Sequence, residues 1–503
     1  MTSSRAVNQD HQQGDGGNVD DLLQEPLLSA EELGESHVNE NDDYIVDGLP
    51  WKTAFLVKSL FFLDALGSST WGRFSAIYYN LHGLNSQHIG VIEGVRAVIP
   101  TGSMVVWGVV ADQFHSQKRV WLTTKVVSTS VLLTLAIPWV YSSFWRILGV
   151  SVLSQLFVSN GILDAYTLEL LGTENKMFYG RYRLYASLSW GAGSIIMGWV
   201  TDHYGFEPNF IMFGLLGFIM IVLVATKIPN TSSSESPSNS RSGASSDAGK
   251  ITELMLLACR PRVFIFLLEV VIMGAGMATV ERLLFLYMVN ELEASTLLCG
   301  LSVGVNVLFE LPIFWYASKF MAVLGHDGMF ILSMTCFVFR LYGYTLLTPA
   351  TKWLILLLEV MHGITFACFW VVSTDISKVL IHQTRGAFWK TAIPSSVQML
   401  YSALGVSVGS IVGGWAMNRY GSRVMYIHTA SIVGVTLLLH IIGSIGSRLV
   451  CNGESFLPDY PHSSEVSPNE EERPSHLETF MGHQDQDCDL PTSDQEHTGQ
   501  STD

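Results

Sequence analysis

Long apolar runs alternate with short polar breaks over most of the 503 residues. Each run holds about 20–25 residues, the length that a helix needs to cross about 30 Å of hydrocarbon. The pattern predicts twelve membrane-spanning helices, at residues 54–79, 88–111, 120–141, 145–171, 181–202, 209–227, 262–289, 297–320, 328–347, 352–376, 387–417 and 424–447.

One longer break, the Ser-rich stretch 229–250, follows the sixth apolar run and shows no periodicity. Such a composition is typical of a flexible linker. We therefore expect an all-α membrane protein made of two six-helix bundles, at 51–228 and 261–447, joined by a linker at 229–260.

A short phrase occurs twice in the chain. Residues 193–205 read GSIIMGWVTDHYG and residues 409–421, 216 positions later, read GSIVGGWAMNRYG. Six spans with their connections have about this length, and six is an even number, so the two copies run the same way across the membrane. The phrase predicts a parallel repeat about an axis along the membrane normal. Its glycines suit a helix pressed against a neighbour, although Gly-rich membrane helices can also look alike by chance.

The charge distribution separates the two ends of the chain from its body. The chain is 49% hydrophobic and 14% charged, with a net charge of −16. Residues 1–50 hold twelve Asp and Glu against one Arg, and residues 448–503 hold thirteen against two Arg. The body is therefore slightly basic, and the polar, acidic tails at 1–50 and 448–503 are expected to be disordered. No basic patch alternates with aromatic residues, which argues against binding nucleic acid.

Familiar catalytic and metal-binding patterns are missing from the sequence. The six cysteines are scattered without a CxxC pair, which indicates neither a disulfide framework nor a zinc site. A phosphate-binding loop, an HExxH motif and a nucleophile elbow are likewise missing. The first fifty residues hold no apolar stretch preceded by positive charge, so no cleavable signal peptide is expected. We predict neither an enzyme nor an ATP-driven pump, and no cofactor.

Basic residues in the connections predict the orientation. If the N-terminus lies in the cytosol, cytosolic connections hold fourteen Lys and Arg and the opposite side holds four. The positive-inside rule then places both termini in the cytosol. We expect a monomeric, multi-pass protein of the lipid bilayer, in either the plasma membrane or a vacuolar or endosomal membrane.

Three stretches resemble a known transporter family. GVVADQFHSQKR, at 108–119, is similar to the loop signature of the major facilitator superfamily, in which G-x-x-x-D is followed by basic residues. FYGRYRLYASLSWGAGSIIMGW, at 178–199, and LEVMHGITFACFW, at 358–370, resemble the subgroup of lactose permease and nucleoside–proton symporters. That subgroup includes the eukaryotic "major facilitator superfamily domain-containing protein six" type.

The resemblance implies a major facilitator fold and transport by alternating access, with a binding site between the two halves. It also implies that the loop signature gates the cytosolic side. The Gly allows close packing, and an Asp at a helix end can act as a latch through its charge. Gln113 stands where the family has a basic residue. The matching residues are Gly108, Asp112, Lys118 and Arg119.

Ionisable residues inside the apolar runs point to a proton site. Each costs about 2.5–3.5 kcal/mol on insertion scales, so each needs a partner or a task. Glu359 and His362 share a helix face because they stand three residues apart, and Arg340 on the preceding span falls at a comparable depth. The Arg can keep the carboxylate ionised in one state, and a buried carboxyl that loses its cation binds a proton more readily.

Lactose permease uses these residue types on the equivalent helices, but here the Glu precedes the His, so which of the two titrates stays open. A static Glu–Arg pair that only fixes helix packing is the alternative. Asp64 and Glu310 are further proton-coupling candidates. A Glu-x-x-His pair can also be half of a di-metal site, but that site needs a second copy, so we expect no metal.

Other charged and aromatic residues in the spans are candidates for substrate contact. Asp64 has no basic residue within one turn, and Trp71 shares its face. Glu93 and Arg96 lie one turn apart and either neutralise each other or bind solute. Phe366 and Trp370 continue the face of Glu359 and could stack on a sugar ring or a base. The set is Asp64, Trp71, Glu93, Arg96, Asp164, Glu281, Phe366 and Trp370.

Together these patterns predict a secondary transporter of a small polar organic solute, sugar-like or nucleoside-like, driven by protons. Its expected partners are that solute, H⁺ and the bilayer. The alternatives are an uncoupled facilitator and a receptor or scaffold that keeps the fold without transporting. Only the coupled transporter needs a titrating carboxylate at mid-depth.

Overall fold

The computed structural model describes residues 44–114, 116–158, 161–172, 174–228, 252–384, 387–450 and 455–459. The described residues from Ile45 to Asp459 form one compact unit. The Ser-rich core of the predicted linker and most of both acidic tails lie outside the described residues. Residues 252–258, which we assigned to the linker, are helical.

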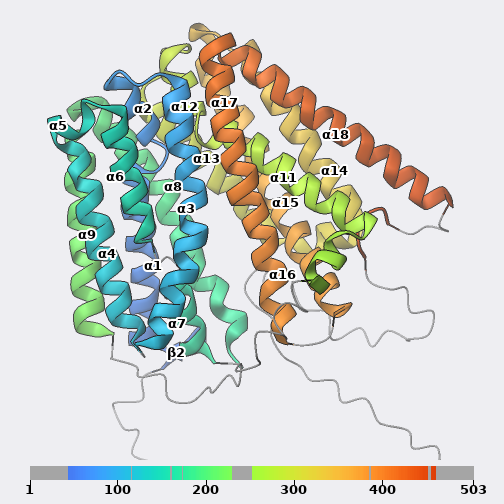
Figure 1. Ribbon diagram of the computed structural model, residues 1–503, viewed down its shortest axis with the longest axis horizontal. Helices are drawn as coiled ribbons and strands as arrows, with labels where there is room; N and C mark the ends of the chain where they lie inside the picture. Colours follow the sequence, from blue (N-terminus) through green and yellow to red (C-terminus); the bar gives the residue numbers. More distant parts are fainter. Residues whose placement is uncertain are drawn as a thin grey trace, which may run out of the picture. The chain divides into compact units, whose positions relative to one another are not determined.

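The first half of the unit is built of helices that correspond to the first six predicted spans (Figure 1). They are α1 (Trp51–Trp71), α2 (Ser75–Leu81), α3 (Ser86–Gln113), α4 (Gln117–Leu133), α5 (Pro138–Tyr141), α6 (Phe144–Leu156), α7 (Gly161–Leu171), α8 (Tyr179–Tyr204) and α9 (Glu207–Lys227), with short 3₁₀ turns η2 (Thr134–Ala136) and η3 (Lys176–Phe178).

The second half repeats this plan. Its elements are α11 (Pro261–Glu281), α12 (Leu284–Asn290), α13 (Thr296–Trp315), α14 (Ala317–Leu346), η4 (Pro349–Leu354), α15 (Ile355–His382), α16 (Ala387–Met399), the π-helical turn η5 (Leu400–Val406), α17 (Ser407–Tyr420) and α18 (Ser422–Val450).

Nine helical segments among the described residues are long and apolar enough to cross a membrane. Three further predicted spans coincide with α1, α4 and α8, which contain more polar and charged residues. The helical membrane architecture is as predicted, whereas the count of twelve spans stays a prediction.

Two of the spans are broken in their middle. Between α1 and α2 the backbone leaves helical geometry at Gly72, which has φ 0° and ψ −108°. The matching break lies between α11 and α12, at Arg282 and Leu283. Arg73 and Arg282 stand 209 residues apart, close to the offset of the repeat. Each half therefore places one arginine at the interruption of its first span.

The repeated phrase lies where the two halves meet. In α8, Ser194 faces Gly300 of α13, and a Cβ atom at Gly300 would overlap the Ser194 carbonyl oxygen. In α17, Ser410 faces Gly90 of α3, where a Cβ atom would overlap the Ser410 carbonyl oxygen. Only glycine permits so close an approach of two backbones. The two contacts are equivalent under the predicted repeat, and α17 lies beside α3 in Figure 1.

Both contacts lie toward the same end of the unit. We call this the closed end and define it by residues 82–86, 203–207, 290–296 and 420–422, where α3, α8, α13 and α17 begin or end. The opposite end, formed by residues 44–50, 116–117, 174–178 and 455–459, is called the linker end because residue 228 leaves the first half there.

A small hairpin covers the linker end of the first half. Strands β1 (Ile45–Val46) and β2 (Leu49–Pro50) pair antiparallel, within the stretch that we assigned to a disordered tail. Asp47 in its turn accepts hydrogen bonds from Lys58 at 2.5 Å and from Arg181 at 2.7 Å. The Tyr182 hydroxyl donates to the Asp47 carbonyl oxygen at 2.9 Å. The YGRYRL motif at the start of α8 therefore holds this hairpin.

Two opposing effects act on the pKa of Asp47. Burial of the carboxyl group raises its pKa, but the hydrogen bonds and charges of Lys58 and Arg181 outweigh burial and hold the pKa below its ordinary value of 3.8. A lowered pKa means that the ionised form stabilises the folded state. This contribution is complete above the ordinary value and is lost as the pH falls through the lower, folded-state pKa.

A short strap covers the linker end of the second half in a similar way. Within Ser455–Asp459, the backbone N–H groups of Phe456 and Leu457 donate to the Asp327 carboxylate at 2.9 and 3.0 Å. The Leu457 side chain is fully buried. This segment, too, lies in a stretch that we assigned to a disordered tail.

The contact of Gly300 with the α8 backbone predicts the effect of adding a methyl group. Gly300→Ala should lower the stability by about 1–3 kcal/mol, because α8 and α13 must move apart. Gly108→Ala is the matched control, since no atom lies within 4 Å of its Cβ position, and it should be neutral or stabilise by up to about 1 kcal/mol. Thermal unfolding of the purified proteins measures both, and equal Tm values for the two variants would contradict the close packing.

The hairpin contacts predict a pH-dependent effect of Asp47→Asn. The variant should unfold at a lower Tm than the parent above about pH 5, where Asp47 is ionised in both states. The difference should shrink below the ordinary value of 3.8 and vanish at more acid pH. Arg181→Gln should lower the Tm less than Lys58→Gln does, because the Arg181 side chain is 61% exposed and the Lys58 side chain only 14%. A difference that grows as the pH falls would refute this assignment.

Candidate functional site

The structure brings Arg340, Glu359 and His362 together between α14 and α15. Arg340 Nη2 donates to both Glu359 carboxylate oxygens, at 3.2 and 3.1 Å, and Arg340 Nη1 lies 2.5 Å from His362 Nδ1. Arg340 and Glu359 are fully buried and His362 is 3% exposed. An arginine, a carboxylate and an imidazole thus form one contact group in the interior of the second half.

Tyr344 completes this group, and the sequence analysis missed it. Its hydroxyl donates to Glu359 Oε1 and accepts a 2.5 Å hydrogen bond from Arg340 Nε. Tyr344 stands four residues after Arg340, so both side chains lie on one face of α14. That spacing was a usable signal, because a buried tyrosine hydroxyl needs a partner.

Aromatic rings lead from this group toward the middle of the unit. His362 stacks on Phe366 with ring centroids 5.8 Å apart, and Phe366 lies 6.1 Å from Trp370. Trp370 in turn contacts Tyr401 in the π-helical turn η5, at 4.9 Å. Phe366 and Trp370 therefore continue the face of Glu359, as the helical spacing indicated.

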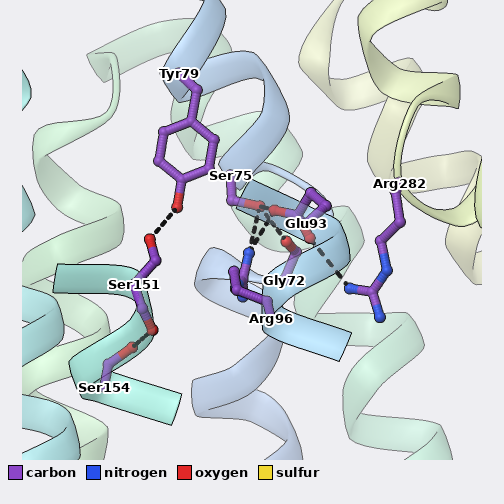
Figure 2. Close-up of polar contacts among 8 residues, drawn as sticks. All are labelled: Gly72, Ser75, Tyr79, Glu93, Arg96, Ser151, Ser154 and Arg282. Carbon is purple, nitrogen blue, oxygen red and sulfur yellow. Dashed lines mark hydrogen bonds and ion pairs between the residues drawn. The ribbon is translucent and has the colours of Figure 1, made fainter. Parts of the chain in front are cut away.

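A second polar group spans the two halves beside the broken helices (Figure 2). Arg96 donates to Glu93 at 2.5 Å and to Ser75 at 3.1 Å. The other Glu93 oxygen lies 3.4 Å from Nη1 of Arg282, which comes from the second half. Glu93 and Arg96 thus neutralise each other locally, and Glu93 also pairs across the halves.

Several buried polar atoms near this group have no hydrogen-bond partner within the described part of the protein. A buried donor or acceptor without a partner costs about 1–3 kcal/mol. A Cβ atom at Gly363, next to His362, would lie 2.7 Å from the Glu310 backbone nitrogen, and the rings of Trp370 and Tyr401 lie 4.9 Å apart, so α13, α15 and η5 meet here. The unpartnered atoms are Arg73 Nη1, Arg282 Nε, Asn306 Nδ2 and Oδ1, Trp370 Nε1 and the Tyr401 hydroxyl.

We define the central polar set as nine residues around this point: Arg73, Glu93, Arg96, Glu281, Arg282, Asn306, Glu310, Trp370 and Tyr401. It draws on both halves and on both broken spans. Such a mixture of donors, carboxylates and aromatic rings can bind a solute that offers both acceptors and donors.

Three predicted contact residues lie elsewhere and make their contacts within the first half. Asp64 accepts a 2.6 Å hydrogen bond from Lys125 of α4, so it has a basic partner from another helix. Asp164 accepts from the Tyr179 hydroxyl at 2.6 Å. Trp71 is 4% exposed and packs against Tyr78, Tyr79 and Phe210. Trp71 is the last residue of α1 and its ring packs among aromatic residues of the first half, so its contact with a solute stays a prediction.

The loop signature makes contacts within the first half. Lys118 donates to the carbonyl oxygens of Ala225 and Ile228 at the end of α9, at 2.8 and 2.6 Å. A cation at the C-terminus of a helix satisfies its free carbonyl groups. Gly108 has no neighbour within 4 Å of its Cβ position, and Arg119 is exposed. The Asp112 side chain lies outside the described residues, so its gating role stays a prediction.

Arg73 and Lys125 are the basic residues that the sequence analysis overlooked. Both stand inside predicted helical stretches, in TWGRFSA and LTTKVVS. Intramembrane charges are costly, so their presence alone was a signal. The offset of 209 residues between Arg73 and Arg282 was a second one.

Comparison with known proteins identifies the class. The family model described as "MFS_1 like family" matches residues 57–428, and the chain belongs to this family. A maltose permease of Geobacillus stearothermophilus is 23% identical over 71% of this chain and 86% of its own length. The human "Major facilitator superfamily domain-containing protein 6-like" is 26% identical over 46% of this chain and 36% of its own length.

Solved structures share the fold. The nucleoside transporter NupG superposes with a TM-score of 0.61 at 15% identity, covering 77% of this chain and 98% of that one. A peptide transporter POT in complex with sulfate also reaches 0.61, at 13% identity, covering 81% and 96%. The protein is a transporter of the major facilitator type, an integral membrane protein and not an enzyme.

The buried contact group predicts a non-additive effect on folding. Arg340→Ala should sharply reduce the yield of folded, monodisperse protein, because it leaves the Glu359 carboxylate buried without its cation. Arg340→Ala combined with Glu359→Gln should recover much of that yield, since the uncompensated charge is gone. Size-exclusion profiles of the two single variants and the double variant measure this coupling. A double variant that is as poorly folded as the sum of the single losses would contradict a direct Arg340–Glu359 pair.

Proposed function

We propose that the protein moves a small polar organic solute, sugar-like or nucleoside-like, together with a proton. The observation that supports this most directly is the adjacency of two features. A buried Arg340–Glu359–His362 group lies at one end of an aromatic line, and the unpartnered polar atoms of the central polar set lie at the other.

The central polar set suits a hydroxyl-rich solute. Each hydroxyl both donates and accepts, so it can accept from Arg73 Nη1 or Trp370 Nε1 and donate to Glu281 or Glu310. The rings of Trp370 and Tyr401 offer apolar faces for a sugar or a base. The maltose permease and the nucleoside transporter to which the chain is similar are named for solutes of this size.

Coupling to protons follows from the contacts of Glu359. Its carboxylate accepts hydrogen bonds from both Arg340 and Tyr344 in the state described. A movement of α14 against α15 that withdraws the arginine leaves a buried carboxylate, which is neutralised most simply by taking up a proton. Solute bound to the central polar set can control that movement through the line from Trp370 to His362.

Transport then proceeds by alternating access. The state described has its halves in backbone contact at the closed end, through Gly90 and Gly300. The excess of basic residues in the connections supports a cytosolic location of the linker end and both tails. In that orientation the closed end faces away from the cytosol, and the solute exchanges from the linker end.

Uptake by reconstituted proteoliposomes tests the proposal with a panel of disaccharides and nucleosides, with and without an imposed pH gradient. Glu359→Gln should reduce gradient-driven accumulation at least tenfold while leaving solute exchange intact, because the amide keeps the shape but cannot titrate. Arg73→Gln should reduce both, because it removes a solute contact. Asp164→Asn is the control, since that carboxylate pairs with Tyr179 away from the central polar set.

Each alternative has its own outcome. Glu359→Gln that accumulates solute as the parent does would refute the proton role of Glu359. A parent that exchanges solute but ignores the pH gradient would show an uncoupled facilitator. A parent that carries nothing in the panel would favour a receptor or scaffold, or another solute class.

A further inference from the structure

One carboxylate at the closed end reaches from the first half to the second. Asp202, near the end of α8, accepts hydrogen bonds from the Thr296 backbone N–H at 2.7 Å and from the Leu297 backbone N–H at 2.9 Å, each on a different oxygen. The Thr296 hydroxyl lies 2.5 Å from Asp202 Oδ1. Thr296 and Leu297 are the first two residues of α13. Asp202 therefore caps a helix that belongs to the other half.

The N–H groups of the first three residues of α13 all have acceptors in this arrangement. Ser295, its own N-cap, accepts from the Leu298 backbone N–H at 3.2 Å. The N–H groups at the start of a helix have no partner inside the helix and carry a partial positive charge, so a carboxylate stabilises them. Asp202 can cap the N–H groups of Thr296 and Leu297 only while the two halves are in contact at the closed end.

Backbone contact positions Asp202 for this task. Gly198 lies four residues earlier on the same face of α8, and a Cβ atom there would lie 2.5 Å from the Thr296 carbonyl oxygen. The Thr296 hydroxyl is also 2.8 Å from the Gly198 carbonyl oxygen. Separation of α8 from α13 must break these contacts together with the cap.

The equivalent position in the repeat lacks the charge. The second copy of the phrase has Asn418 where the first has Asp202. Gly414, four residues before Asn418, lies against the start of α3. The residue before α3, Asn85, accepts from the His88 backbone N–H at 2.9 Å, as Ser295 does from Leu298. Among the described residues, Asn418 makes no hydrogen bond to the start of α3. The charged cap between the halves is therefore present at one of the two equivalent contacts.

We propose that Asp202 is a positioning residue for transport, a latch that sets how much of the protein rests with the closed end shut. This inference rests on the proposed alternation of the two halves, but it does not depend on which solute is carried. Opening the closed end exposes two helix N–H groups and removes a charge from a helix start. Loss of such a cap shifts a two-state equilibrium by about threefold to tenfold.

Distance measurements between spin labels test the latch without any solute. The labels are placed on cysteines at Tyr204 in the first half and Trp353 in the second, both exposed, in the full chain whose six native cysteines are replaced. In lipid nanodiscs the labelled protein that keeps Asp202 should show mainly the shorter distance between the two labels, which corresponds to the shut closed end. Asp202→Asn should raise the population at longer distance about threefold to tenfold.

A second variant leaves Asp202 in place. Thr296→Pro removes both the backbone N–H and the hydroxyl that reach Asp202, and proline is well tolerated at the first position of a helix. Ser295 already has ψ 156°, which suits a following proline. This variant should shift the distances in the same direction, whereas Asn418→Ala, the repeat-equivalent control, should leave them unchanged.

Three results would overturn the latch. The first is an unchanged distance distribution in both Asp202→Asn and Thr296→Pro. The second is an equal shift in Asn418→Ala, which would show general loosening of the closed end. The third is a lower Tm with unchanged distances, which would make Asp202 only a structural cap. If the variants shift the distances as expected but the parent transports no solute of the panel, the result would count against the proposed function and not against the latch.

Discussion

The arrangement of the two halves depends on close backbone contact at the closed end, where α8 meets α13 and α3 meets α17. A bilayer offers little hydrophobic force between helices, because lipid tails are as apolar as leucine side chains. Helices then hold together through close packing and polar contacts. Gly90, Gly300 and Gly198 provide that packing by having no side chain, and the facing backbones occupy the space. The polar set between the halves exists because these contacts bring the two broken spans together.

Charges inside the halves are paired by residues from different helices. Asp64 meets Lys125, Glu359 meets Arg340, and Glu269 accepts from His440 at 2.8 Å, across 171 positions of sequence. Each pair offsets the cost of a charge in a medium without water. The central polar set differs in that it draws on both halves, and six of its polar atoms have no protein partner among the described residues. Glu269 Oε2 and His440 Nε2 also lack a partner there, but both belong to the second half alone. The groups that can meet a solute between the halves are therefore those of the central polar set.

The sequence predicted those features that depend on local spacing. Apolar runs located the spans, and the spacing of Glu359 and His362, with Arg340 on the preceding span, was enough to locate one contact group. Partners from distant helices, such as Lys125 of α4 for Asp64 of α1, cannot be paired from local spacing and follow only from the three-dimensional arrangement of the helices. The ring contacts of Trp71 with Tyr78 and Phe210 come from other helices, so spacing along α1 could not predict them. The hairpin at 45–50 and the strap at 455–459 show no hydrophobic periodicity. Because they lie in polar, acidic stretches, composition predicted disorder for both.

The Asp64–Lys125 pair also constrains the biogenesis of the protein. During synthesis α1, with Asp64, leaves the ribosome well before α4, with Lys125. A lone carboxylate is penalised by about 2.5–3.5 kcal/mol at the centre of an inserting helix. The insertion machinery must therefore retain α1 in a polar environment until α4 arrives, or admit both together. The first half is thus expected to enter the bilayer as a group of helices and not one span at a time.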